Sequence, residues 1–155
     1  MLILGIDPGT AIMGYGLIEK QGQKLLPVSY SCWRTKSDLP MPQRLLYLFE
    51  SLDAFVKEHS PDVMAVEELF FNRNTTTALT VGQARGVVLL AGARHNIPVY
   101  EYTPLQVKQA VVGYGKADKQ QIQYMVKALL TLAEKPKPDD TADALAVAIC
   151  HAHSC

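Results

Sequence analysis

The order of apolar and polar positions predicts alternating strands and helices. Near-continuous apolar runs occupy residues 2–6 and 63–66, and such runs are typical of strands buried on both faces of a sheet. Between them, from residue 41 to 59, apolar positions recur at helical spacing. A strand, a helix and a second apolar strand favour a right-handed crossover, in which the two strands lie parallel and side by side.

The rest of the pattern predicts an α/β fold. Residues 13–19 and 24–34, joined by a turn at 21–23, favour two strands that continue the first into an antiparallel meander. We expect a fifth strand at 97–100 and further helices at 76–96, 104–112, 118–132 and 139–153. The 155 residues therefore predict a single domain, 1–155, with a mixed five-stranded sheet flanked by helices.

Acidic residues end two of the predicted strands. Asp7 closes the first apolar run, and Pro8 and Gly9 stop strand pairing there. Glu67 and Glu68 follow the 63–66 run, and strand alternation lets only one of the two reach a given face. The carboxyl edge of an open α/β sheet is where ligands bind. Taken alone, however, Asp7-Pro8-Gly9 is also ordinary turn chemistry.

Two further acids lie three residues apart at the start of the last predicted helix. Asp140 and Asp143 share a helix face, although acids at a helix N-terminus also complement the helix dipole. Clustered with Asp7 and Glu67, they would repel one another unless a cation neutralised them. Oxygen ligands without His or Cys select Mg²⁺ or Mn²⁺, and two such ions can activate water and stabilise the leaving oxygen in phosphodiester cleavage.

Charge is unevenly distributed in a chain whose formal net charge is zero. Residues 104–137 hold six lysines against Asp118 and Glu134. A cationic second half beside an acidic cluster fits a phosphate-backbone ligand lying across a carboxylate site. The alternative is a solvated lysine-rich surface.

The cysteines and the long glycine-bearing helix give weaker indications. Three cysteines without metal or redox spacing favour free thiols in a reducing cytosol, so we expect a cytoplasmic location and no membrane partner. The predicted 76–96 helix carries Gly82, Gly86 and Gly92, which permit close approach. This face could serve core packing or a homodimer contact, and we take it as the candidate interface.

Five motifs together resemble one known family. They are GIDPGT at 5–10, VEELFFNRN at 66–74, GQARG at 82–86, QVKQAVVG at 106–113 and DDTADALA at 139–146. They are similar to the RuvC family of Holliday junction resolvases over nearly the whole chain. The resemblance implies a ribonuclease H-like fold and a homodimer. It also implies Mg²⁺-dependent symmetric nicking of four-way DNA junctions in homologous recombination and DNA repair, leaving 5′-phosphate ends.

The resemblance also implies roles for individual residues. It assigns two Mg²⁺ ions per subunit, with Mn²⁺ as a substitute, to Asp7, Glu67, Asp140 and Asp143, which are also the catalytic acids. It adds Lys108 as a catalytic residue, and it implies DNA binding by Phe70, Lys108 and Lys119. We also expect the nearby cations Arg73 and Lys116 to bind DNA. Glu68 and Asp139 depart from the family pattern by adding acid beside Glu67 and Asp140. A junction-binding and branch-migration helicase complex is the further partner implied.

Two other functions compete with this one. An ATP-dependent phosphotransferase of the actin and sugar-kinase type also places an Asp-x-Gly-Thr loop after a strand, but such proteins have two lobes and a second glycine-rich loop that this sequence does not show. A catalytically silent junction-binding protein of the same fold is the second rival, and the presence of all four acids argues against it.

Overall fold

A computed structural model of the chain describes residues 1–68 and 75–155. Its centre is a mixed five-stranded sheet in the order β3-β2-β1-β4-β5. The strands are β1 (Leu2–Asp7), β2 (Ile12–Gln21), β3 (Lys24–Arg34), β4 (Val63–Glu67) and β5 (Val99–Tyr102). The predicted meander and crossover are both present, because β1 pairs antiparallel with β2 and parallel with β4.

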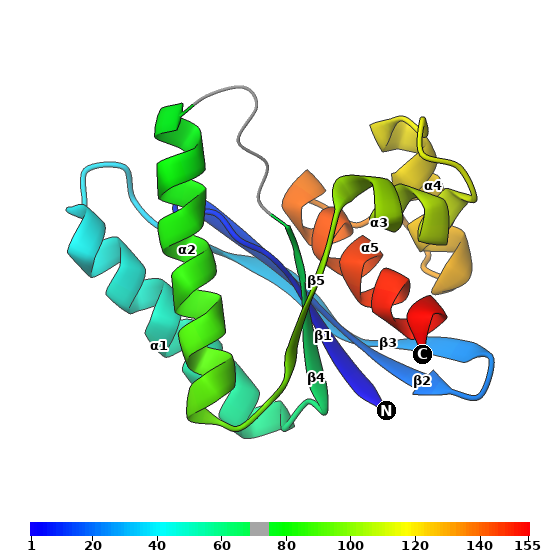
Figure 1. Cartoon of the computed structure of the whole chain (residues 1–155), viewed down its shortest axis with the longest axis horizontal. Coiled ribbons are helices and arrows are strands. Elements are labelled where there is room, and N and C mark those ends of the chain that lie inside the picture. The colour runs from blue at the N-terminus through cyan, green and yellow to red at the C-terminus, as the bar shows by residue number, and fades with distance from the viewer. Residues whose placement is uncertain (69–74) are drawn as a thin grey trace.

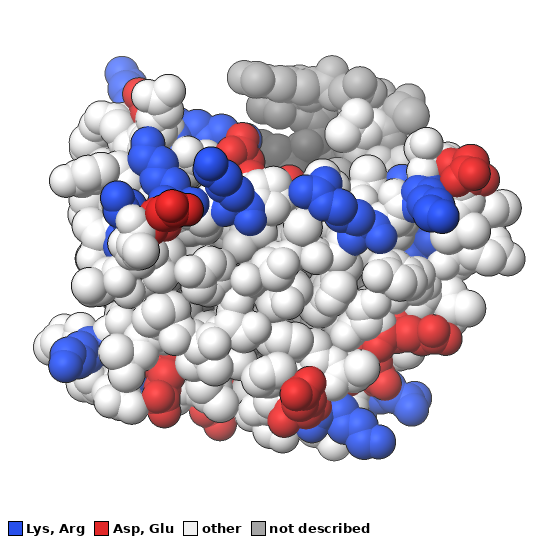
Figure 2. Space-filling model, turned by 180° about the vertical axis from the view of Figure 1, so that it is seen from behind, with Lys and Arg blue, Asp and Glu red and all other residues white. Residues whose placement is uncertain are grey.

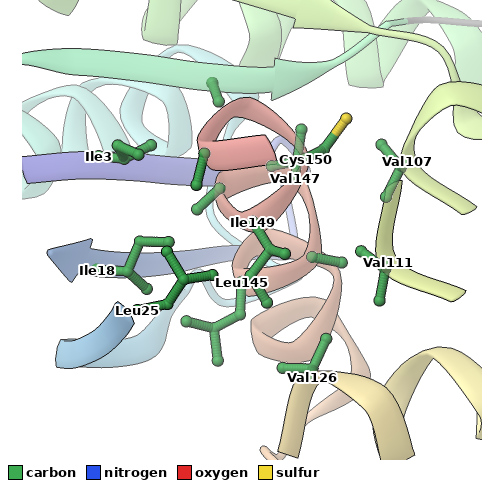
Figure 3. Close-up of a cluster of buried hydrophobic side chains, with 14 of the residues drawn as sticks. Ile3, Ile18, Leu25, Val107, Val111, Val126, Leu145, Val147, Ile149 and Cys150 are labelled. Atoms are coloured by element: carbon green, nitrogen blue, oxygen red, sulfur yellow. The ribbon is translucent and has the colours of Figure 1, made fainter. Parts of the chain in front are cut away.

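Helices cover both faces of the sheet (Figure 1). On one face lie α1 (Met41–His59) and α2 (Thr75–Arg94). On the other lies α5 (Asp139–Ser154), with α3 (Pro104–Val112) and α4 (Lys119–Leu129) packed outside it. Figure 3 shows Leu145 and Ile149 of α5 between the sheet and the outer helices. The result is a layered arrangement in which α5 is almost wholly enclosed.

Strand alternation divides the apolar side chains between two cores. Ile3 of β1 joins the cluster under α5, whereas Leu4 and Ile6 join the cluster under α1 and α2. In β4, Ala65 faces α5 and Val66 faces the opposite layer. By the same alternation, Asp7 follows Ile6 of β1 and points to the α5 side. Glu67 follows Val66 of β4 and points to the same side. The requirement to bury both faces therefore fixes where the acids point.

Glycines let α5 approach the sheet closely. A β-carbon at Gly5 would overlap the backbone carbonyl of Ala144, and one at Gly14 would overlap that of Asp140. Thr141 adds a direct link, because its hydroxyl donates to the carbonyl of Ser31 at 2.9 Å. The first turn of α5 is therefore held against β1, β2 and β3.

Several element boundaries differ by one to three residues from those that the sequence predicts, and those of β5 and α4 have a clear backbone cause. The strand predicted at 97–100 lies at Val99–Tyr102, because α2 ends through Asn96 in the left-handed region (φ 55°) and residues 97–98 complete the turn. The helix predicted at 118–132 ends at Leu129, where Thr131 also takes a positive φ of 54°. In both cases, a residue in the left-handed region ends the helix before the apolar pattern does.

Candidate metal and nucleic-acid site

Asp7 and Glu67 lie at the ends of adjacent parallel strands. Ile6 of β1 pairs with Val66 of β4, so the acid that follows each one reaches the same edge of the sheet. Both acids are half-buried, whereas Glu68 is exposed and its backbone N–H donates to the carbonyl of Tyr102 at 2.7 Å. The expectation that one glutamate of the doublet would face the acid group is met by Glu67.

The first turns of α5 bring Asp140 and Asp143 to the same place. The carboxyl of Asp7 lies within hydrogen-bonding reach of Asp140, and the charges of Asp140, Asp143 and Glu67 all act on it. Asp139 turns outward, where its Oδ1 accepts from Gln123 at 2.9 Å and its Oδ2 lies 3.4 Å from Nζ of Lys119. The extra acid therefore belongs to the contact with α4 and not to the central acid group.

We call Asp7, Glu67, Asp140 and Asp143 the acid group, and burial together with nearby acids raises the pKa of three of them, Asp7, Glu67 and Asp143. Burial, followed by the charges of Asp143, Asp140 and Glu67, raises the pKa of Asp7 to about 8. Burial and Asp143 raise the pKa of Glu67 to about 7, against the opposing effect of Lys108 and Lys119. Burial also raises the pKa of Asp143 to about 6. Such shifts arise where several carboxylates are buried close together.

The spacing and chemistry of the acid group bear on whether it can hold a metal ion. Within residues 1–68 and 75–155, no three His, Cys, Asp or Glu side chains form a ready-made metal cluster. The donors are nevertheless all carboxylate oxygens from three elements, which is the chemistry that hard divalent cations require. The chemical type of these donors therefore fits Mg²⁺ or Mn²⁺.

A cleft adjoins the acid group on the α3 and α4 side. It has a volume of about 340 Å³ and is lined by apolar residues and by five charged ones, the acids Glu67, Asp118 and Asp143 and the lysines Lys108 and Lys119. Asp143 raises the pKa of Lys119, and both lysines lower that of Glu67. The structure thus brings two of the predicted cations beside the acids, as a phosphate-binding site requires.

Of the other predicted DNA-binding residues, the structure describes only Lys116. Lys116 is exposed between α3 and α4 and does not line the cleft. Phe70 and Arg73 lie outside the described residues, so their predicted roles stay predictions. The sequence interpretation also missed Gly5 and Gly14, whose only signal was their two-residue spacing from other strand positions on the α5 side.

The glycines predicted on the α2 face have different surroundings. Gly92 is buried, and a β-carbon there would overlap the side chain of Val99, so this glycine serves core packing. Gly86 is exposed with open space around it. Exposed Leu79 and Leu90 lie seven residues before and four residues after Gly86, on the same helical face. An outward apolar face on α2 is therefore real, but Gly92 is not part of it.

Comparison with known proteins decides the family. The family model described as Crossover junction endodeoxyribonuclease RuvC matches residues 3–151. The chain belongs to this family. A RuvC from Desulfitobacterium hafniense is 75% identical over 154 residues, covering 99% of this chain and 93% of that protein. A RuvC from Desulforamulus reducens is 68% identical over 152 residues, covering 98% and 93%.

Solved RuvC structures agree with this fold. Thermus thermophilus RuvC aligns with a TM-score of 0.91 at 38% identity, covering 99% of this chain and 94% of that one. The structure of T. thermophilus RuvC in complex with a Holliday junction substrate aligns with a TM-score of 0.94 at 37% identity, over the same shares. The predicted ribonuclease H-like α/β fold is confirmed, and this RuvC-family chain is an endodeoxyribonuclease that depends on a divalent metal. No helix in the described part of the chain is long and apolar enough to cross a bilayer.

Proposed function

We propose that this chain resolves Holliday junctions by paired, symmetric nicks in homologous recombination and DNA repair, with Mg²⁺ as the metal. The nicks leave 5′-phosphate ends. The observation that carries this proposal is the acid group, in which carboxylates from β1, β4 and α5 act on one another beside two lysines. The full-length likeness to RuvC proteins, one of them solved with a Holliday junction substrate, supports the choice of DNA substrate.

Asp7, Glu67, Asp140 and Asp143 would hold the metal, with two Mg²⁺ ions per subunit and Mn²⁺ as a substitute. Four carboxylates can carry up to four negative charges, which two divalent ions match. When bound, the ions supply an activated water and stabilise the leaving oxygen of the phosphodiester. Burial and the neighbouring acids raise the pKa of Asp7 to about 8, which supports this assignment because a bound cation would favour the ionised carboxyl.

The lysines of the cleft act on the DNA backbone. Lys119 is exposed at the start of α4 and binds a phosphate, so it fixes the strand across the acids. Lys108 is half-buried on the wall of the cleft, where an ammonium group can neutralise charge that develops on the phosphate in the transition state. Phe70 and Arg73 are proposed DNA contacts from the sequence alone, and Lys116 is a peripheral one.

A homodimer fits a substrate that must be cut on two strands of like polarity. A two-fold axis presents two identical sites to the junction. The outward face of α2, formed by Leu79, Gly86 and Leu90, is the proposed interface because large exposed apolar side chains flank a glycine there. We also propose a cytoplasmic location and a branch-migration helicase complex as a further partner, both by analogy with the family.

A synthetic four-way junction tests the proposal. Asp7→Asn removes one ligand charge and leaves the basic cleft in place. We expect this variant to bind the junction and to lose Mg²⁺-dependent nicking. Nicking by Asp7→Asn at the wild-type rate would overturn the assignment of the acids.

The rival of the same fold is a silent junction-binding protein. If the unaltered protein bound the junction but never nicked it with Mg²⁺ or Mn²⁺, that rival would hold. A linear duplex of the same sequence serves as the control for structure selectivity, since we expect it to remain uncut.

A further inference from the structure

A second group of cations lies on the opposite side of the acid group from Lys108 and Lys119. We call Arg34, Lys36 and Arg44 the β3–α1 corner. Arg34 ends β3 opposite Ile12, two residues along β2 from Gly14, which pairs with Asp7 of β1. In Figure 1, the β3–α1 connection and the start of α1 lie at the same end of the molecule as the end of β1. The corner therefore shares an edge of the sheet with the acids.

Arg44 is fixed to the turn that presents Asp7. Its Nε donates to the hydroxyl oxygen of Thr35 at 2.9 Å. That hydroxyl donates in turn to the carbonyl of Thr10, and the backbone N–H of Thr35 donates to Ala11 at 3.0 Å. Thr10 and Ala11 follow Asp7 directly after the Pro8-Gly9 turn. The guanidinium is thus connected to the loop of the first acid through a single threonine.

Among the described residues, the only side-chain hydrogen bond of Arg44 is the one from its Nε to Thr35. No ion pair joins Arg44 to a carboxylate among the residues that the structure describes, and Asp38 is the only acid between residues 34 and 49. A guanidinium has five N–H donors in a planar fork that suits a phosphate. Because one of the five is already fixed, binding an anion orders less of this side chain than it would order of a free arginine.

The corner presents its cations at the surface. Figure 2 shows Lys and Arg side chains spread across the upper part of the molecule, with a few Asp and Glu side chains among them. Arg34 and Lys36 are exposed, and Arg44 is half-buried. A strand of DNA laid across the acid group would therefore meet cations on both sides.

We propose that the β3–α1 corner is a second phosphate-binding surface, in which Arg44 holds a backbone phosphate on the Asp7 side of the acid group. The inference rests on the proposed nuclease function, and it goes beyond it by assigning the strand a second contact. Two phosphate contacts that flank the acids prevent the scissile bond from rotating away, so Arg44 is a positioning residue.

The salt dependence of junction binding tests the corner. In the Asp7→Asn background, which is not expected to cut, we would measure the affinity for a synthetic four-way junction across a salt series. Arg44→Ala is expected to reduce the slope of log K against log salt by about 0.9, the value for one lost phosphate contact. Arg44→Lys keeps the charge, so it should keep the slope and lose part of the affinity.

Lys57→Ala is the matched control, since Lys57 is an exposed cation in the last turn of the same helix. It should leave the slope unchanged. An unchanged slope in Arg44→Ala overturns the proposal, and so does a lower melting temperature with no change in slope, because the contact to Thr35 would then be structural only. Should Arg44→Ala fail to fold, Lys36→Ala carries the same test, as its exposed side chain makes no described contact.

The outcomes of the two proposals remain distinguishable. If Asp7→Asn still nicked the junction, the acid assignment would fail, and the salt slopes could be measured without Mg²⁺. If instead the Asp7→Asn protein bound the junction and did not nick it, an unaffected slope in Arg44→Ala would remove the corner alone.

Discussion

Gly14 of β2 lies directly beneath the backbone carbonyl of Asp140 in the first turn of α5. No other residue type fits there, because a β-carbon would overlap that carbonyl. Gly14 also pairs with Asp7 across the antiparallel ladder. One glycine therefore sets the approach of the helix acid to the strand acid.

Gly14→Ala should move the start of α5 away from the sheet. We expect a loss of about 1–3 kcal/mol in the free energy of unfolding, as for other overpacked cores. Mg²⁺-dependent nicking should fall by about a hundredfold, because misplacement of a catalytic group by about 1 Å has that effect. Thermal unfolding and a nicking assay measure the two. Gln23→Ala in the exposed turn of the same hairpin should change neither, and wild-type nicking in Gly14→Ala would contradict the argument.

The acid group should make the metal-free protein less stable as pH rises. Asp7, Glu67 and Asp143 have pKa values of about 8, 7 and 6, all above their ordinary values of 3.8, 4.5 and 3.8. The folded state therefore keeps protons that the unfolded state releases, and the free energy of unfolding falls from about pH 4 to about pH 8. Without metal, the free energy of unfolding measured with denaturant should fall less for Asp7→Asn than for the wild type as the pH rises across this range.

At pH 8, Mg²⁺ should make the wild type more stable to unfolding than Asp7→Asn, the reverse of the order expected without metal. A bound cation favours the ionised acids of the wild type, whereas Asp7→Asn lacks one ligand charge and gains less. A difference between the two proteins that stays constant from pH 4 to pH 8 would show that repulsion in the acid group does not shift the titration of Asp7.

Lys119→Ala should weaken junction binding and raise the pKa of Asp143 further, because Lys119 lowers it in the wild type. The slope of log K for junction binding against log salt concentration should become about 0.9 less steep than in the wild type. The Mg²⁺ concentration needed for half-maximal nicking should rise most at low pH, where Asp143 would be protonated. Lys24→Ala, an exposed lysine at the opposite edge of the sheet, is the control. A salt slope equal to that of the wild type would rule out a phosphate contact at Lys119.

The outward face of α2, formed by Leu79, Gly86 and Leu90, is expected to hold the homodimer together. Leu79 and Leu90 are 65% and 59% exposed, so replacing both with Glu should leave the fold intact and separate the proposed dimer into monomers. Sedimentation measures the mass, and monomers should nick a junction on one strand at a time. Leu46 of α1 is 54% exposed, and Leu46→Glu is the control that should remain dimeric. A dimer that survives the double substitution would place the interface elsewhere.

Local sequence patterns predict much of this architecture. The apolar runs ending at Asp7 and Glu67 predict buried strands, and the crossover rule places them side by side. The three-residue spacing of Asp140 and Asp143 predicts a shared helix face. These inferences hold because burial and helical periodicity act over a few residues at a time.

Only the tertiary structure decided how these pieces meet. The sequence does not show that Gly14 leaves room for the backbone of Asp140, or that Asp139 forms an ion pair with Lys119. Nor does it show that Thr35 connects Arg44 to the turn after Asp7. Each contact joins residues from different elements of the fold. It also overestimated α4, since Thr131 ends the helix in the left-handed region within a continuing apolar pattern. The residue types of the acid group came from the sequence, whereas the raised pKa values of Asp7, Glu67 and Asp143 arise from packing that brings three elements into one half-buried space.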